Sequence, residues 1–332
     1  MLVLASAVLV GAPVRAEPVL AAVQKRGHLL CGANGHAPSF SVVDAQGQWS
    51  GFEVDFCRAI AAAVLGDATK VHFVPVSTAD RFDALRQGRI DVLTRNTIDT
   101  LERTTGTGVR DAAVIYLDRQ VVVVARDLQV GKLAELNKGT ICTLSRTPYA
   151  TAIDDWFGAR NLTAKTVLFD SQDALYKALY DGTCRAVSQV MAPMASTVIA
   201  SGQAAKYIVL PDLVALHPLA AYVKAGDDPW YDVVRWTFNA LLHGEELKVG
   251  MTTADAERSS ANPEVRRLLG VEPAFGKLLG LDESWAFNLL KQVGNYAEIY
   301  ERNVGKGSPL GFARGVNALW SEGGILFPMP MR

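Results

Sequence analysis

Residues 88–103 read GRIDVLTRNTIDTLER. The mostly apolar residues 90–93 predict a short buried strand, the polar residues after them predict a turn, and Thr100 is typical of the cap of a helix. Arg103 then falls in the first helical turn, where the positive end of the helix dipole disfavours a cation. A bound anion would remove this penalty, because a guanidinium and free loop amides match a carboxylate. We interpret this stretch as half of a carboxylate-binding site. The alternative is a surface arginine paired with Glu102 or Asp99.

The composition of the chain is that of an ordered globular protein. It has 332 residues, of which 49% are hydrophobic and 20% charged, with a net charge of -1. This length is sufficient for two lobes of ordinary domain size. The near-neutral charge, without a run of Lys or Arg, gives no basis for a nucleic-acid partner.

The first sixteen residues differ from the rest of the chain. Leu2 to Val10 is an apolar run of the length of a signal-peptide core, and residues 14–16 before Glu17 fit a small-residue cleavage site. So short a run cannot span a bilayer, which takes roughly 20 residues. We predict that residues 1–16 are a signal peptide that directs the chain to the periplasm. A buried N-terminal helix is the alternative.

Four cysteines allow three pairings. Pairing of sequence neighbours, Cys31 with Cys57 and Cys142 with Cys184, would place one bridge in each half of the chain. Metal binding is the rival interpretation, but no CxxC or Cys/His pair has the spacing of metal ligands. We therefore expect structural disulfides, which suit an oxidising compartment, and no metal or other cofactor.

The order of predicted elements indicates an α/β fold. Strands and helices alternate from residue 24 to about residue 118, and the pattern repeats after residue 120, as in a mostly parallel sheet flanked by helices. Ligands of such sheets bind beyond the carboxyl ends of the strands. We predict one lobe from residues 24–119 and 219–332 and a second lobe from residues 120–218, with a hinge where the chain crosses near residues 118–121 and 217–220. The C-terminal part reads as a helical extension, with helices over residues 228–242 and 282–304.

Several longer motifs carry a resemblance to a known family. They are GFEVDFCRAIAAAV (51–64), RIDVLTRNT (89–97), TLER (100–103), NPEVRRLLG (262–270), KQVGNYAEIYERNVG (291–305) and GSPL (307–310). With the four cysteines, they resemble the periplasmic solute-binding proteins of polar amino-acid ABC transporters, above all the general L-amino-acid binding group. The resemblance covers nearly everything after Glu17. It implies a two-lobe, type 2 periplasmic-binding-protein-like fold that closes on one amino acid and delivers it to a membrane permease. We expect a monomer.

The resemblance also implies roles for particular residues. Arg103 would bind the ligand carboxylate with the loop amides of Asn96 and Ile98. The walls would come from residues 34–40 and from Phe52, and the loop 145–147 would close over the carboxylate. The ligand-binding residues expected are Arg103, Asn96, Ile98, Phe52, Asn34, His36, Arg146, Thr147, Gln189 and Val190.

One position departs from the family pattern. An aspartate after the strand that follows Cys184 takes the α-ammonium group in relatives, and Val190 stands at that position here. Loss of a buried charge partner costs about 2–5 kcal/mol, or roughly 30-fold to several-thousand-fold in affinity. Either the ligand is a carboxylate without an ammonium group, such as a keto acid, hydroxy acid or dicarboxylate held by Arg103, Arg146 and Arg95, or α-amino acids still bind through another group. Gln189 and Asp118 are the candidates for that group. The loop residue Arg146 also replaces a glycine, and Ile98 a serine or threonine.

An enzyme is the hypothesis from a different class, because some dehydratases that act on carboxylated rings share this fold. The chain contains no GxSxG, HExxH or phosphate-loop motif. His36 is the histidine placed to face the cleft, and we interpret it as a wall residue. A sensor or adhesin is a third, remote hypothesis. We expect a receptor without catalytic residues.

Overall fold

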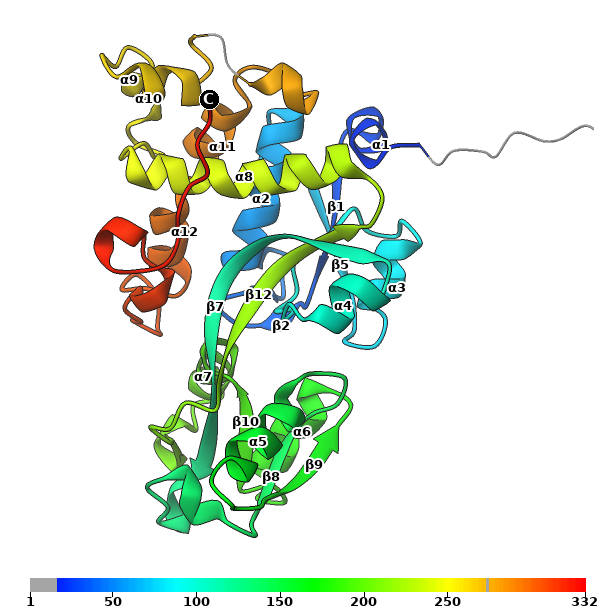
Figure 1. Cartoon of the computed structure of the whole chain (residues 1–332), viewed down its shortest axis with the longest axis vertical. Helices are drawn as coiled ribbons and strands as arrows, with labels where there is room; N and C mark the ends of the chain where they lie inside the picture. Colours follow the sequence, from blue (N-terminus) through cyan, green and yellow to red (C-terminus); the bar gives the residue numbers. More distant parts are fainter. Residues whose placement is uncertain (1–16, 273–274) are drawn as a thin grey trace, which may run out of the picture.

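The computed structural model describes residues 17–272 and 275–332, so the predicted signal peptide over residues 1–16 lies outside the described residues. Figure 1 shows two lobes joined by two long strands. The strands are β1 (Leu29–Ala33), β2 (His36–Ala37), β3 (Ser41–Val43), β4 (Trp49–Ser50), β5 (Val71–Pro75), β6 (Val92–Leu93), β7 (Val109–Ala125), β8 (Thr140–Leu144), β9 (Lys165–Phe169), β10 (Ala186–Val190), β11 (Tyr207–Val209) and β12 (Ala215–Lys224). The helices are α1 (Val19–Arg26), α2 (Phe52–Leu65), α3 (Arg81–Arg86), α4 (Leu101–Gly106), α5 (Tyr149–Gly158), α6 (Gln172–Tyr180), α7 (Met191–Ala200), α8 (Asp228–Glu246), α9 (Ala254–Glu257), α10 (Pro263–Leu268), α11 (Trp285–Gln292) and α12 (Tyr296–Asn303).

Each lobe contains parallel strands. In the first lobe β1 lies between β5 and β6 and is parallel to both, and in the second lobe β8 lies between β9 and β10 and is parallel to both. The order across the whole sheet is β5-β1-β6-β12-β7-β10-β8-β9, with β11 also paired to β7. Parallel strands flanked by helices confirm the predicted α/β fold.

The long strands β7 and β12 are antiparallel partners from Val109 opposite Lys224 to Gln120 opposite Ala215. They run continuously from one lobe to the other (Figure 1). The return strand begins at Ala215, and the predicted lobe boundaries at residues 119 and 219 fall inside continuous strands. Those boundaries stay a prediction.

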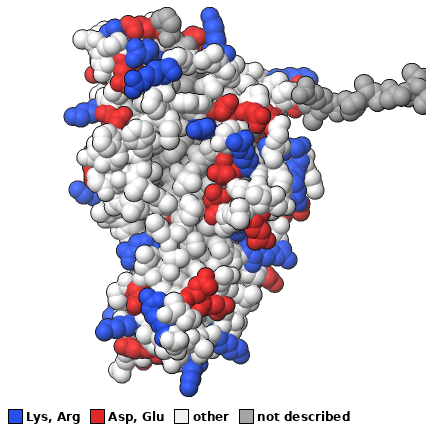
Figure 2. Space-filling model, viewed as in Figure 1, with Lys and Arg blue, Asp and Glu red and all other residues white. Residues whose placement is uncertain are grey.

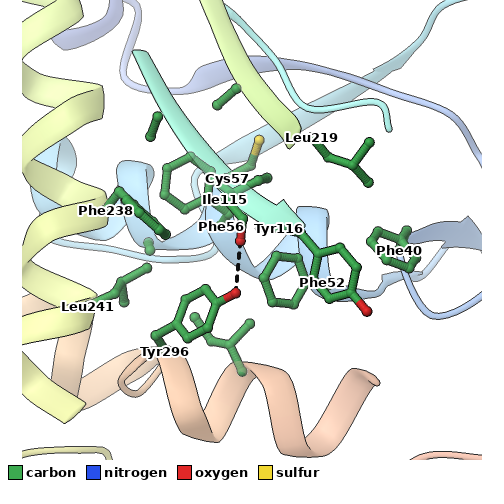
Figure 3. Packing of buried hydrophobic residues seen from close by; sticks show 14 of the residues in the cluster. Phe40, Phe52, Phe56, Cys57, Ile115, Tyr116, Leu219, Phe238, Leu241 and Tyr296 are labelled. Carbon is green, nitrogen blue, oxygen red and sulfur yellow. Dashed lines mark hydrogen bonds between the residues drawn. The ribbon is translucent and has the colours of Figure 1, made fainter. Parts of the chain in front are cut away.

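An aromatic cluster anchors the C-terminal helices to the first lobe (Figure 3). The ring of Phe52 at the start of α2 lies 5.6 Å from that of Tyr116 on β7 and 5.7 Å from that of Tyr296 on α12. The hydroxyl of Tyr296 donates a hydrogen bond of 2.9 Å to the carbonyl of Ile115. Edge contacts between buried rings stabilise the fold beyond the effect of the apolar area that the rings bury. The helical extension is therefore tied to the crossing strand β7.

Both predicted disulfides are present. Cys31 on β1 is bonded to Cys57 on α2, and Cys142 on β8 is bonded to Cys184 just before β10, with a Cα–Cα separation of 6.3 Å in each. One bridge therefore ties a strand to a helix in the first lobe, and the other ties two neighbouring segments of the second lobe.

The prediction of one helix over residues 282–304 is wrong. The segment forms two helices, α11 and α12, separated by a turn in which Gly294 has a φ of 94°, a conformation that favours glycine. Asn295 then caps α12: its side chain accepts from the backbone N–H of Glu298, and the Glu298 carboxylate accepts from the N–H of Asn295. This capping box starts a new helix inside a stretch whose apolar spacing looks continuous.

Charged side chains of both signs are interspersed over the face shown in Figure 2. Within the described ranges, no helix combines the length and hydropathy of a membrane span. The unusual charges of this protein lie in its interior, between the lobes.

Candidate ligand-binding site

The cleft between the lobes contains two adjoining cavities. The inner cavity, about 30 Å³, is lined by Asn34, Thr78, Arg81, Arg95, Asn96, Leu144, Thr147, Tyr149, Gln172, Gln189, Val190 and Pro193. The outer cavity, about 260 Å³, is lined by Asn34, His36, Pro75, Val76, Ser77, Thr78, Arg95, Asp170, Ser171, Gln172 and Asp173. These residues follow the carboxyl ends of strands β1, β5, β6, β8, β9 and β10. The site therefore lies where the parallel sheets predict it.

Three arginines of the first lobe are brought together beside the inner cavity. Arg81 is the first residue of α3, Arg95 follows β6, and Arg103 lies in α4. Arg81 and Arg103 are 3% and 8% exposed. Burial lowers the pKa of all three guanidinium groups, that of Arg95 to about 10, and the positive charges of Arg103 and Arg95 lower the pKa of Arg81 further. Clustered buried cations are unfavourable unless an anion accompanies them.

The three guanidinium groups differ in what they contact. Arg103 donates to the carbonyl of Ile98 and, over 3.2 Å, to the carbonyl of Arg146 in the second lobe. Arg95 donates through Nε to the carbonyl of Val76. The Arg81 guanidinium carbon lies 5.0 Å from the ring centroid of Phe82. Its Nε is buried and has no hydrogen-bond partner in the part of the chain that the structure describes.

Further unpaired polar atoms belong to residues that line the same cavity. The buried Nδ2 and Oδ1 of Asn96 and the Nε2 of Gln189 also have no partner among residues 17–272 and 275–332. The hydroxyl of Tyr176 donates to Oε1 of Gln189 over 2.8 Å, which leaves the amide nitrogen free. Each unpaired buried polar group costs about 1–3 kcal/mol. Because Arg81, Asn96 and Gln189 all line one small cavity, these groups are arranged for a ligand.

Two buried acids lie near the site but do not line either cavity. Glu53 accepts hydrogen bonds from the backbone N–H of Asn96 and, over 3.3 Å, from the hydroxyl of Ser41. Asp118 on β7 accepts from the backbone N–H of Ala192, 3.1 Å away, at the start of α7. Burial raises the pKa of each carboxyl group to about 7. Both acids are thus occupied by the protein's own donors.

The structure brings only part of the predicted site to the cavities. Asn34, Asn96, Thr147, Gln189 and Val190 line the inner cavity, and His36 lines the outer one. The backbone amide of Asn96, predicted to face the ligand, is bonded to Glu53, so its side chain is the part left free.

Four predicted residues lie elsewhere. Phe52 is part of the aromatic cluster, because its ring packs into the first-lobe core (Figure 3). Arg103 and Ile98 line neither cavity, and the Arg103 guanidinium donates a hydrogen bond to the carbonyl of Ile98. Arg146 has an exposed side chain and a φ of 56°, the left-handed conformation that favours glycine, and contributes its carbonyl to Arg103.

Arg81 was missed by the sequence analysis. Its signal is the same one that identified Arg103, because it is a cation in the first turn of a helix. Only its position after β5, next to the loop after β6, brings it to the cavity.

Hydrogen bonds join the two lobes across the cleft. Asn34 Nδ2 donates to Gln172 Oε1 over 2.9 Å, and the hydroxyl of Ser196 on α7 donates to that of Ser39 over 2.9 Å. Together with the contact from Arg103 to Arg146, these bonds hold the lobes in a closed arrangement.

Two α/β lobes that close on a polar cleft, joined by two crossing strands, define a solute-binding protein. The chain belongs to the bacterial extracellular solute-binding proteins, family 3, whose family model matches residues 29–252.

Individual proteins match nearly the whole chain. This chain is 39% identical to the general L-amino acid-binding periplasmic protein AapJ of Rhizobium johnstonii, over 99% of this chain and 97% of that protein. It is also 39% identical to the glutamate/glutamine/aspartate/asparagine-binding protein BztA of Rhodobacter capsulatus, over 93% of this chain and 92% of that protein. A solved periplasmic binding protein from Brucella ovis with glutathione bound is 37% identical, with a TM-score of 0.92 over 95% of this chain and 100% of that chain.

Proposed function

We propose that this protein is the periplasmic receptor of an ABC importer, which closes its lobes over a small solute bearing a carboxylate and delivers it to a membrane permease. The observation that carries the proposal is the inner cavity, where the buried donors of Arg81, Asn96 and Gln189 have no partner within the described residues. A carboxylate offers only acceptors and a negative charge, so it matches both the free donors and the clustered arginines.

The named ligands of the relatives support a carboxylate-bearing solute. AapJ and BztA are named for binding amino acids, and the Brucella ovis protein holds glutathione. All of these ligands carry carboxylates. L-amino acids are the first class of solute to be tested. The proposal includes export of the chain by the signal peptide over residues 1–16. It also includes action as a monomer.

The proposed mechanism is hinge closure. A solute that contacts both Arg81 of the first lobe and Gln189 of the second lobe binds the closed form more tightly than the open one and shifts the population toward closure. We place the hinge where β7 and β12 pass from one lobe to the other, near residues 118–121 and 217–220. The protein binds and releases the solute without changing it.

A thermal-shift screen of the mature chain, residues 17–332, tests the proposal. The panel holds the twenty L-amino acids and a set of keto acids, hydroxy acids and dicarboxylates. A ligand at 100 times its Kd stabilises the folded state by about 2.7 kcal/mol, so a true solute raises the unfolding temperature measurably. Small-angle scattering with the same solute should show the compact form. A panel in which no carboxylate raises the unfolding temperature would refute the proposal.

A further inference from the structure

We infer that the solute carries no ammonium group on the carbon next to the carboxylate that enters the inner cavity. The inference rests on the proposed function, and it names the class of solute more narrowly: dicarboxylates, keto acids and hydroxy acids are favoured over α-amino acids.

The fully buried side-chain atoms left unpaired on the residues that line the inner cavity are mostly donors. They are Nε of Arg81, Nδ2 of Asn96 and Nε2 of Gln189, and Oδ1 of Asn96 is the one acceptor among these buried atoms within the described residues. An ammonium group offers three donors and accepts nothing. The three buried donors do not match it, whereas they suit the oxygens of an acid.

The charges on the cavity wall oppose an ammonium group as well. Arg81 and Arg95 both line the inner cavity, and none of its described lining residues is an aspartate or glutamate. An α-ammonium is bonded to the carbon beside the carboxylate, so it enters this same cationic space. At the end of β10 it would meet Val190, which is 3% exposed and apolar.

The nearest acids do not line the inner cavity. Glu53 and Asp118 accept hydrogen bonds from backbone amides. Burial lowers the pKa of Arg95, and the charge of Glu53 partly offsets this. Asp170 and Asp173 line the outer cavity, which shares Arg95 with the inner one. A cationic group of the solute reaches these two acids from the outer cavity.

Calorimetric titration of the mature wild-type protein with three acids of equal chain length tests the inference. The probes are glutarate, 2-oxoglutarate and L-glutamate, and the twenty L-amino acids are titrated beside them. We expect glutarate or 2-oxoglutarate to bind at least tenfold more tightly than L-glutamate and than any other L-amino acid. A smaller or reversed preference overturns the inference but leaves the carboxylate receptor intact. If no probe binds, the proposed function fails with it.

The variant Val190→Asp supplies the missing counter-charge, and Val190→Asn is its matched control of nearly equal shape. We expect V190D to improve the affinity for L-glutamate relative to glutarate at least tenfold, and V190N to leave the ratio near that of the wild type. Equal ratios in V190D and the wild type would overturn the inference. The wild-type titration decides the question independently if V190D does not fold.

Discussion

The substitution Arg81→Met separates the role of this residue in binding from its role in stability. Methionine has a similar length and packs well against an aromatic ring, so it can keep the contact with Phe82 while the charge is removed. Arg81 is only 3% exposed, and its Nε has no hydrogen-bond partner within the described parts of the chain. Its loss therefore breaks no hydrogen bond of that nitrogen to the protein, but removes a donor from the solute.

The magnitude follows from these contacts. A hydrogen bond between charged groups contributes about 1.5–3 kcal/mol, so a guanidinium that makes two such bonds to a carboxylate contributes about 3–6 kcal/mol. This corresponds to a Kd raised about 100-fold to about 20,000-fold. The unfolding temperature of the solute-free protein should stay the same or rise, because Arg81 is repelled by Arg103 and Arg95 and loses solvation on burial.

Isothermal titration calorimetry measures the affinity, and thermal unfolding without solute measures the stability. Arg89→Met is the matched control, since Arg89 is an exposed arginine whose ion pair with Asp80 spans 2.7 Å, and exposed pairs contribute little to stability. R81M with an affinity within threefold of the wild type would refute the reasoning. A fall in solute-free stability equal to the loss of binding energy would instead assign Arg81 a structural role.

Three further predictions concern closure, pH and backbone strain. Asn34→Ala and Gln172→Ala should each weaken solute binding about fivefold, because their 2.9 Å hydrogen bond joins the closed lobes and contributes about 1 kcal/mol. The double variant should lose no more solute affinity than either single variant. Additive losses of affinity, measured by calorimetry, would contradict a role of this hydrogen bond in closure. Burial raises the pKa of Glu53 from 4.5 to about 7, so the folded state binds the extra proton between these values and the free energy of unfolding falls as pH rises through them, by about 3 kcal/mol from this group. Glu53→Gln should remove that fall. Urea unfolding of both proteins from about pH 4.5 to 8 measures it, and a difference in the free energy of unfolding that stays constant with pH would contradict the prediction. Arg146→Gly should stabilise the protein by about 1 kcal/mol, because residue 146 has a φ of 56°, and the unfolding temperature should rise by about 1–2 °C with solute affinity unchanged.

Much of the fold follows from local sequence patterns. The cap at Thr100 and the start of a helix at residue 228 are found where the pattern predicts them, because caps and hydrophobic periodicity act over a few residues, whereas only Val92–Leu93 of the strand predicted over residues 90–93 forms β6. The break between α11 and α12 was missed, since the apolar stripe continues across it. There the capping box formed by Asn295 and Glu298 overrides the periodicity.

The site was predicted less completely than the fold. Gln189 and Val190, named from the family resemblance, lie at the end of β10 and line the inner cavity, where parallel strands present their carboxyl ends. Phe52 was assigned to the wall, but an aromatic residue at a helix start can face either the core or the cleft. Its packing against Tyr116 and Tyr296 decides for the core.

Composition, periodicity and cysteine count were enough to indicate two α/β lobes with disulfides, since these depend on burial patterns that each segment carries in itself. Whether a given arginine meets the solute depends on contacts between segments far apart in the chain. Arg103 is engaged by the carbonyl groups of Ile98 and Arg146, whereas Arg81 lines the inner cavity and its Nε has no partner among the described residues. Both are cations in the first turn of a helix, and only the assembled lobes distinguish them, because hydrogen-bond partners and burial are properties of the folded chain.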